Sequence, residues 1–202
     1  MGGFSVIKAM EWILASASPR RKQLLAELLD NFEIIPSLAD ENVQGYATPK
    51  ALVLQLAELK AKEVAMRPEN MGKMVIGSDT VVAFEGEVLG KPKDEADAFR
   101  MLKMLSGKAH AVYTGVCFAQ NSERGYVAKA QAEKTDVYFE ELSDAWIREY
   151  IQGGSPMDKA GAYGIQDGGL VKKIEGSYTN VVGFPIELVQ EMIKEIKGGS
   201  DD

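Results

Sequence analysis

The residues Trp12-Ile-Leu-Ala-Ser-Ala-Ser-Pro-Arg-Arg21 pass from a short apolar run into a polar turn. Ser18 is a residue type that caps helices, and Pro19 suits the first helical position. Leu24, Leu25, Leu28 and Leu29 then recur at helical spacing. The stretch therefore predicts a buried strand over 12–15 and, directly after it, a helix that buries one face. A strand followed at once by a helix is the opening of an α/β fold.

The rest of the chain continues this alternation, with hairpins inserted. Strands are expected at 32–35, 73–76, 81–84, 88–89, 109–120, 126–139 and 169–174. Further helices are expected after the caps Thr48, Asp94 and Ser143, and after Pro185. In the helix from Thr48 to about Met66, Leu52, Leu56, Leu59 and Glu63 fall near one face, and Lys60 and Lys62 flank it. The predicted fold class is α/β, a mixed twisted sheet flanked by helices.

Length and composition indicate an ordinary globular protein. The chain has 202 residues, of which 46% are hydrophobic and 26% charged, so it can bury a sizeable core. The longest apolar runs have four residues, far fewer than the roughly 18 that span a bilayer, so no membrane helix is expected. We expect an N-terminal extension over 1–10 without a secretory signal, a single domain over 11–197 and a disordered tail over 198–202.

Charge and rare residues narrow the function classes. The net charge of −7 argues against a general nucleic-acid binder and leaves small anionic ligands possible through a local basic pocket. The single Cys117 excludes an intrachain disulfide and fits a reducing, cytoplasmic compartment, and the single His110 excludes a site with two histidine ligands. Both are interpreted as structural residues. Carboxylates and lysines near the turns favour an oxygen-liganded Mg²⁺ or Mn²⁺ acting on an anionic substrate.

Three segments are candidates for the site. The turn that carries Ser16, Ser18, Arg20 and Arg21 offers backbone N–H groups, hydroxyls and guanidinium groups to phosphate oxygens, although an ordinary capped helix with solvated arginines is an equal alternative.

The second candidate is Gly77-Ser-Asp-Thr80, which places Asp79 at the exit of an apolar strand. Asp79 could bind a metal or act as a base, and a capping or turn aspartate is the plainer alternative. The third is Asp158-Lys-Ala-Gly-Ala-Tyr-Gly-Ile-Gln166, whose glycines allow a ligand to approach the backbone. A surface loop is the alternative there, and it leaves Lys159 and Gln166 unexplained.

Taken together, the motifs resemble those of the Maf family of nucleoside triphosphate pyrophosphatases, first associated with septum formation. The matching segments are Leu-Ala-Ser-x-Ser-Pro-Arg-Arg at 14–21, Asp40-Glu41, Leu56-Ala57 with Lys60-Ala61, Gly77-Ser-Asp-Thr80, Leu89-Gly-Lys-Pro92, Leu105-Ser-Gly107, Tyr113-Thr-Gly115, Asp158–Gln166 and Asn180-Val-Val-Gly-Phe-Pro185.

The resemblance implies a bilobed fold with a central cleft, similar to inosine triphosphate pyrophosphatases. It implies hydrolysis between the α and β phosphates, with Asp79 as the proton acceptor, and it makes a homodimer plausible. Arg20, Thr80 and Gln166 match the subfamily that acts on dTTP and UTP. Within this family, a 7-methyl-GTP pyrophosphatase is the main alternative. A nucleotide-binding regulator of division that does not hydrolyse is the other, and the presence of every candidate catalytic residue argues against it.

Physical chemistry agrees with this implication, because cleavage of a phosphoanhydride requires charge neutralisation and a base for water. Cationic side chains that can neutralise the triphosphate are Arg20, Arg21, Lys60, Lys91 and Lys159. Asp79 can accept the proton, and Glu41 is expected to help Asp79 hold the metal, since one carboxylate fixes a divalent cation weakly. Whether Asp79 is base, ligand or both stays open.

Overall fold

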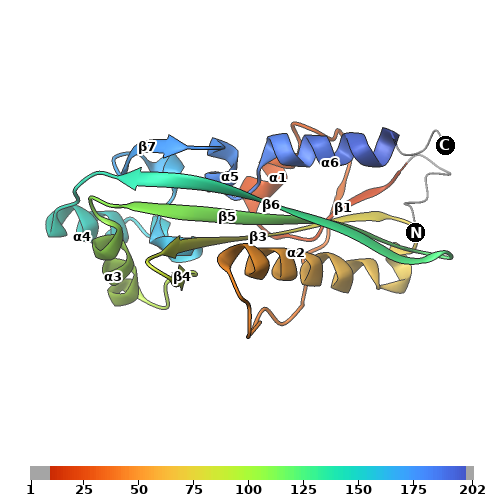
Figure 1. The fold of residues 1–202 in the computed structure, drawn as a ribbon, viewed down its shortest axis with the longest axis horizontal. Helices are drawn as coiled ribbons and strands as arrows, with labels where there is room; N and C mark the ends of the chain where they lie inside the picture. Colours follow the sequence, from red (N-terminus) through yellow and green to blue (C-terminus); the bar gives the residue numbers. More distant parts are fainter. Residues whose placement is uncertain (1–9, 199–202) are drawn as a thin grey trace. The chain divides into compact units, whose positions relative to one another are not determined.

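The computed structural model describes residues 10–198, and its elements alternate much as the sequence predicts (Figure 1). They are β1 (Trp12–Leu14), α1 (Pro19–Leu25), β2 (Glu33–Ile34), α2 (Pro49–Ala65), η1 (Pro68–Asn70), β3 (Met74–Phe84), β4 (Glu87–Leu89), α3 (Glu95–Leu105), β5 (Ala109–Ser122), β6 (Gly125–Phe139), α4 (Asp144–Gln152), η2 (Ser155–Asp158), η3 (Ala160–Ala162), η4 (Ile165–Asp167), β7 (Val171–Glu175), α5 (Tyr178–Val182) and α6 (Ile186–Gly198). The N-terminal extension up to residue 9 and the tail from 199 lie outside the described residues. Gly198, predicted as the first residue of the tail, still belongs to α6.

The sheet is mixed, which confirms the predicted fold class. Its strand order is β2-β1-β3-β5-β6-β7, and β4 pairs with β3. β1 runs parallel to both β2 and β3, whereas β4 is antiparallel to β3 and β7 is antiparallel to β6. The predicted caps are confirmed at all three helices: Thr48, Asp94 and Ser143 each accept a hydrogen bond from a backbone N–H in the first turn.

The chain forms two compact units. Of the described residues, unit 1 comprises 10–79, 114–133 and 183–198, and unit 2 comprises 80–113 and 134–182. The chain passes between the units within β3, β5 and β6, and once more after α5. The central cleft expected from the family resemblance stays a prediction. No helix of residues 10–198 is both long and apolar enough to cross a membrane.

Unit 1 buries both faces of its part of the sheet. Along β1, Trp12 and Leu14 join one apolar cluster with residues of α1 and α6, and Ile13 joins another with residues of α2. The same alternation holds in β3 and β5, because successive side chains of a strand point to opposite faces. Figure 1 shows α1 and α6 on one face of these strands and α2 on the other.

Helix α2 packs unusually close to the sheet, and glycines make this possible. A Cβ atom added to Gly77 of β3 would lie 2.2 Å from the carbonyl oxygen of Ala57, and one added to Gly115 of β5 would lie 2.2 Å from that of Val53. Any other residue would collide with the backbone of α2. The prediction that Lys60 flanks the buried face of α2 is wrong, since Lys60 is buried beside Ala57 and Ala61.

A second correction concerns β3. The sequence predicts a strand at 73–76 that is separate from another at 81–84, with Asp79 at the exit of the first. The structure shows one strand of 11 residues, so Asp79 lies in the middle of β3. The prediction ended the strand too early because Gly77 and Asp79 have low β-propensity, whereas pairing with neighbouring strands keeps the chain extended there.

Unit 2 has its own core, built where α3 and α4 meet the sheet. Its fully buried side chains include Leu102, Leu105, Ile147 and Leu170. The segment 158–166, expected to lie outside the core, also contributes to it through Ala162 and Tyr163. This contribution to the core was not predicted, because the segment forms short 3₁₀ turns and has no apolar periodicity.

Candidate active site

A buried ammonium group between two carboxylates is the centre of the candidate site in unit 1. Lys60 Nζ lies 2.6 Å from Asp79 Oδ1 and 3.0 Å from Glu41 Oε2. The side chains of Lys60 and Asp79 are only 10% and 12% exposed, whereas that of Glu41 is 58% exposed. The structure therefore brings together three predicted site residues from α2, β3 and the segment before α2.

The position of Asp79 follows from the packing of its neighbours. Ser78 is fully buried and Asp79 is 9% exposed, so the carboxylate stands on a strand held by the core on both sides. Gly77, two residues earlier, lets α2 approach closely enough for Lys60 to reach Asp79. A carboxylate on a central strand is more rigid than the turn aspartate considered as its alternative.

Arg21 is the second cation that unit 1 places near these carboxylates. Its Nε donates to the Gly183 carbonyl at 2.9 Å and its Nη1 donates to Ser16 Oγ at 3.3 Å. Burial lowers the pKa of Arg21, and the charge of Arg20 acts in the same direction, while Asp79 and Glu41 act to raise it. The contact of Arg21 with the Gly183 carbonyl was not predicted from the sequence, because a backbone oxygen carries no side-chain signal.

The turn at 16–21 is more self-contained than an anion cradle requires. Ser18 N–H donates to Ser16 Oγ at 3.2 Å, and Arg21 N–H donates to Ser18 Oγ at 3.4 Å. Both hydroxyls and both amides are thus engaged within the turn. The interpretation as a capped helix is correct for Ser18, and the phosphate-binding role of Ser16, Ser18 and Arg20 stays a prediction.

The remaining predicted residues belong to unit 2. Lys159 Nζ donates to the Ser155 carbonyl, to Ser155 Oγ at 3.0 Å and to Asp158 at 2.9 Å. Lys91 and Gln166 are exposed, and Thr80 is partly buried in β3. The structure therefore presents Lys91 and Gln166 to solvent, and the roles assigned to all four side chains stay predictions.

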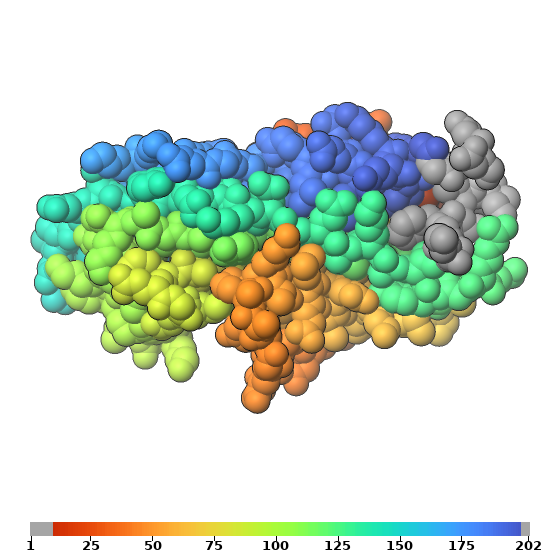
Figure 2. All heavy atoms as spheres, viewed as in Figure 1, coloured from red at the N-terminus to blue at the C-terminus, as the bar shows by residue number. Residues whose placement is uncertain are grey.

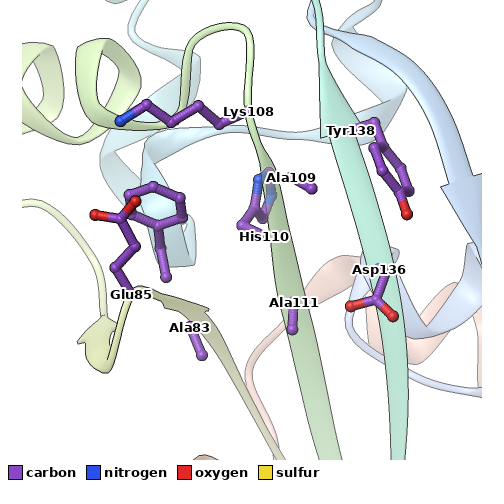
Figure 3. Close-up of a pocket in the computed structure, with 9 residues that line it drawn as sticks. Ala83, Glu85, Lys108, Ala109, His110, Ala111, Asp136 and Tyr138 are labelled. Carbon is purple, nitrogen blue, oxygen red and sulfur yellow. The ribbon is translucent and has the colours of Figure 1, made fainter.

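Unit 2 also contains a hollow of about 580 Å³ that no predicted site residue lines (Figure 3). Its lining residues are Ala83, Phe84, Glu85, Lys108, Ala109, His110, Ala111, Asp136 and Tyr138.

His110 is the buried polar residue of this wall, and its Nε2 lies 2.8 Å from the Tyr163 hydroxyl. Its ring also makes edge contacts with Phe139 and Tyr163. Burial lowers the pKa of His110 to about 4, so the ring is neutral at pH 7. These contacts support the structural interpretation of His110. Cys117 is likewise fully buried, and burial raises the pKa of its thiol to about 12.

The chemistry of Glu41 and Asp79 fits a hard divalent cation. Among residues 10–198, no group of three or more His, Cys, Asp and Glu side chains is placed to hold a metal ion. Two carboxylates suffice for Mg²⁺ when substrate phosphates and water complete its six ligands. Any cation held here must share these oxygens with the Lys60 ammonium.

The mixed α/β architecture is also found in a solved structure. The solved structure of the Staphylococcus aureus Ham1 protein superimposes with a TM-score of 0.53 at 14% sequence identity, and the match covers 91% of this chain and 98% of that one. This similarity confirms the fold.

The sequence then identifies the family. The family model described as Maf-like protein matches residues 11–196, so the chain belongs to the Maf-like family. A protein of Thermococcus kodakarensis named dTTP/UTP pyrophosphatase is 50% identical over 184 residues, which cover 89% of this chain and 94% of that protein. A protein of Clostridium tetani with the same name is 45% identical over 190 residues, which cover 93% of this chain and 98% of that protein.

Proposed function

We propose that this protein hydrolyses nucleoside triphosphates, with dTTP and UTP as substrates, to a monophosphate and pyrophosphate. The observation that carries the proposal is the Lys60 ammonium held between Asp79 and Glu41, in a chain whose 45–50% identical relatives are named dTTP/UTP pyrophosphatase. The reaction needs a rigid base and nearby positive charge, and unit 1 contains both.

The contacts of unit 1 support specific roles. Asp79 accepts the proton of the attacking water, because β3 fixes its carboxylate and Lys60 holds one of its oxygens at 2.6 Å. Arg21, oriented by the Gly183 carbonyl and Ser16, offers a guanidinium group to phosphate oxygens. Lys60 offers an ammonium group that can shift from the carboxylates towards the developing negative charge.

A divalent cation, Mg²⁺ or Mn²⁺, would be held by Glu41 and Asp79 and would supply further neutralisation of the phosphate charge. Ser16, Ser18, Arg20, Lys91 and Lys159 are proposed as additional phosphate ligands.

Arg20, Thr80 and Gln166 are proposed to select the base. A glutamine amide offers one donor and one acceptor, which matches the adjacent carbonyl and imide N–H of uracil or thymine. Cytosine lacks this pattern and 7-methylguanine is larger. The same argument extends the proposed substrates to modified pyrimidine nucleotides, as expected of an enzyme that cleans the nucleotide pool. The homodimer and the cytoplasmic location stay predictions.

The test measures pyrophosphate release from dTTP, UTP, dATP, dGTP and 7-methyl-GTP at saturating Mg²⁺. We expect the two pyrimidine nucleotides to have the largest kcat/KM. Asp79→Asn should lower turnover by about 10²–10⁴-fold because it removes the proton acceptor and keeps the side-chain shape. Asp30→Asn, an exposed position on the loop after α1, is the matched control and should leave the rate unchanged.

Each alternative gives a different result in this test. A larger kcat/KM for 7-methyl-GTP would assign the protein to that branch of the family. Nucleotide binding without any pyrophosphate release would favour a regulator. An Asp79→Asn variant that folds and retains the parental rate would refute the role of Asp79.

A further inference from the structure

The segment that carries Glu41 is weakly packed. Residues 36–47 contain no helix or strand, and Leu38 within it is 83% exposed. In Figure 2 the orange atoms before α2 project from the surface. Burial of apolar side chains therefore contributes little to the position of Glu41.

Polar contacts fasten this segment to α2 instead. Glu63 Oε2 accepts hydrogen bonds from Ser37 Oγ and from Leu38 N–H, each at 2.9 Å. Arg67, one helical turn further on, donates to both carboxylate oxygens of Glu63, each at 2.9 Å, and its Nη2 also donates to the Pro36 carbonyl at 3.3 Å. Pro36, Ser37 and Leu38 are thus fixed to Glu63 of α2 and to Arg67, which lies two residues beyond the end of that helix.

The charge of Glu63 suits this task. Burial acts to raise the pKa of Glu63, but hydrogen bonds from Leu38, Arg67 and Ser37 outweigh it and keep the pKa below its ordinary value. The carboxylate is therefore ionised at neutral pH, and an ionised acceptor forms stronger hydrogen bonds than a neutral one.

The second attachment of the segment to α2 is made by Glu41, which is a residue of the proposed active site. Glu41, three residues beyond Leu38, contacts Lys60, which lies one helical turn before Glu63 on α2. The same helix thus holds the segment at its start through Glu63 and meets it again at Glu41 through Lys60. If the first attachment is lost, the ion pair with Lys60 must hold the exposed Glu41 carboxylate without support from the start of the segment.

We infer that Glu63, oriented by Arg67, is a positioning residue that holds the 36–47 segment so that Glu41 reaches Lys60 and Asp79. The inference rests on the proposed function, because it assigns Glu41 to the same site. Glu63 itself touches neither the substrate nor the reacting atoms.

Limited chymotryptic digestion tests the anchor without reference to activity. The segment contains Leu38 and Tyr46, both exposed and both chymotryptic sites. Glu63→Ala should speed cleavage after Leu38 and Tyr46 by about tenfold or more, because local opening governs cleavage when reclosing is fast. Glu58→Ala, the same substitution at an exposed position of α2, is the matched control and should cleave at the parental rate.

A double-mutant cycle tests the route through Glu41. Glu63→Ala should lower kcat/KM by about tenfold or more, since small displacements of catalytic groups are costly. In a Glu41→Gln background the same change should alter kcat/KM by less than about twofold, because residues acting through one group are not additive. Glu63→Gln keeps an oxygen that can accept from Leu38 N–H and should restore part of the loss.

Ser37→Ala removes the hydrogen bond from Ser37 Oγ to Glu63, together with the one that Ser37 Oγ accepts from Ala39 N–H. It leaves α2 unaltered, so it tests the anchor if Glu63→Ala fails to fold. Unchanged cleavage at Leu38 and Tyr46 in the folded variants would overturn the inference, as would a full tenfold loss in the Glu41→Gln background. A parent protein that releases no pyrophosphate would instead refute the proposed function, and digestion alone would then decide whether Glu63 anchors the segment.

Discussion

Replacing Lys60 with methionine should destabilise the protein and reveal what the buried ammonium does. Methionine keeps an unbranched side chain and removes the charge. At 2.6 Å from Asp79 Oδ1, the gross attraction is about 6 kcal/mol for an effective dielectric constant of about 20. Desolvation of both groups offsets much of it. Removing one partner of a buried pair costs about 3–5 kcal/mol, chiefly because the other charge is left uncompensated.

Glu41 adds little to this figure because it is 58% exposed and an exposed ion pair contributes about 0–1 kcal/mol. We therefore expect Lys60→Met to lower the free energy of unfolding by about 3 kcal/mol at pH 7. Adding Asp79→Asn removes the uncompensated carboxylate and should restore at least about 1 kcal/mol of it.

Urea denaturation of the parent, both single variants and the double variant measures these changes, provided that the urea m-values stay constant. Lys62→Met, a neighbouring and exposed lysine of α2, is the matched control. If the two single substitutions prove additive, or if Lys60→Met costs no more than Lys62→Met, the Lys60 and Asp79 charges are not energetically coupled and the account of the site is wrong.

Three further predictions follow from the site and from unit 2. Exhaustive chelation should abolish pyrophosphate release, and added Mg²⁺ or Mn²⁺ should restore it; full turnover after chelation would contradict the expected metal requirement. Gln166→Ala should reduce the preference for dTTP over dGTP, measured as a ratio of kcat/KM values. The expected loss is about 1–3 kcal/mol for each polar group of the base that is left without a hydrogen bond. The unfolding midpoint should stay unchanged, since Gln166 is exposed. Acid should destabilise unit 2 through His110. The pKa of His110 is about 4 in the folded protein and about 6.5 in the unfolded chain, so the unfolded chain binds more protons in this range. The free energy of unfolding should therefore fall by up to about 3 kcal/mol as the pH falls from 6.5 towards 4. His110→Asn should flatten that part of the curve in pH-dependent urea denaturation, and an unaltered curve would show that another group titrates there.

Local rules predicted most of the elements. The Ser18 and Pro19 pair marked the start of α1, and Thr48, Asp94 and Ser143 marked three more helices, because each cap is a short-range interaction between a side chain and its own first turn. The strand-like segments predicted at 109–120 and 126–139 are confirmed as β5 and β6, and the helix predicted after Pro185 is confirmed as α6. The five-residue helix α5 was missed because it spans little more than one helical turn.

The errors lie where long-range packing decides. The buried face of α2 was predicted wrongly because Leu59 and Glu63 were assigned to it. The small residues Ala57 and Ala61 lie on that face instead, where they allow close contact with Gly77 and leave Lys60 buried. Periodicity cannot anticipate this, since it assigns every lysine to solvent. The sequence signal for this close packing is the pair Ala57 and Ala61 on one side of α2, together with Gly77 and Gly115 in the strands that face it.

The same packing explains why the site residues were found and their geometry was not. Asp79 and Lys60 were predicted as site residues because they belong to family motifs. They are 19 positions apart in the sequence, and this separation does not predict the distance between their side chains. Gly77 determines this distance. Because it has no side chain, α2 packs directly against β3, and Lys60 on the inner face of α2 contacts Asp79 on the strand. The glycine of the Gly77-Ser-Asp-Thr80 motif therefore sets the distance between Lys60 and Asp79, and Gly77→Ala should separate the two side chains even though it alters neither charge.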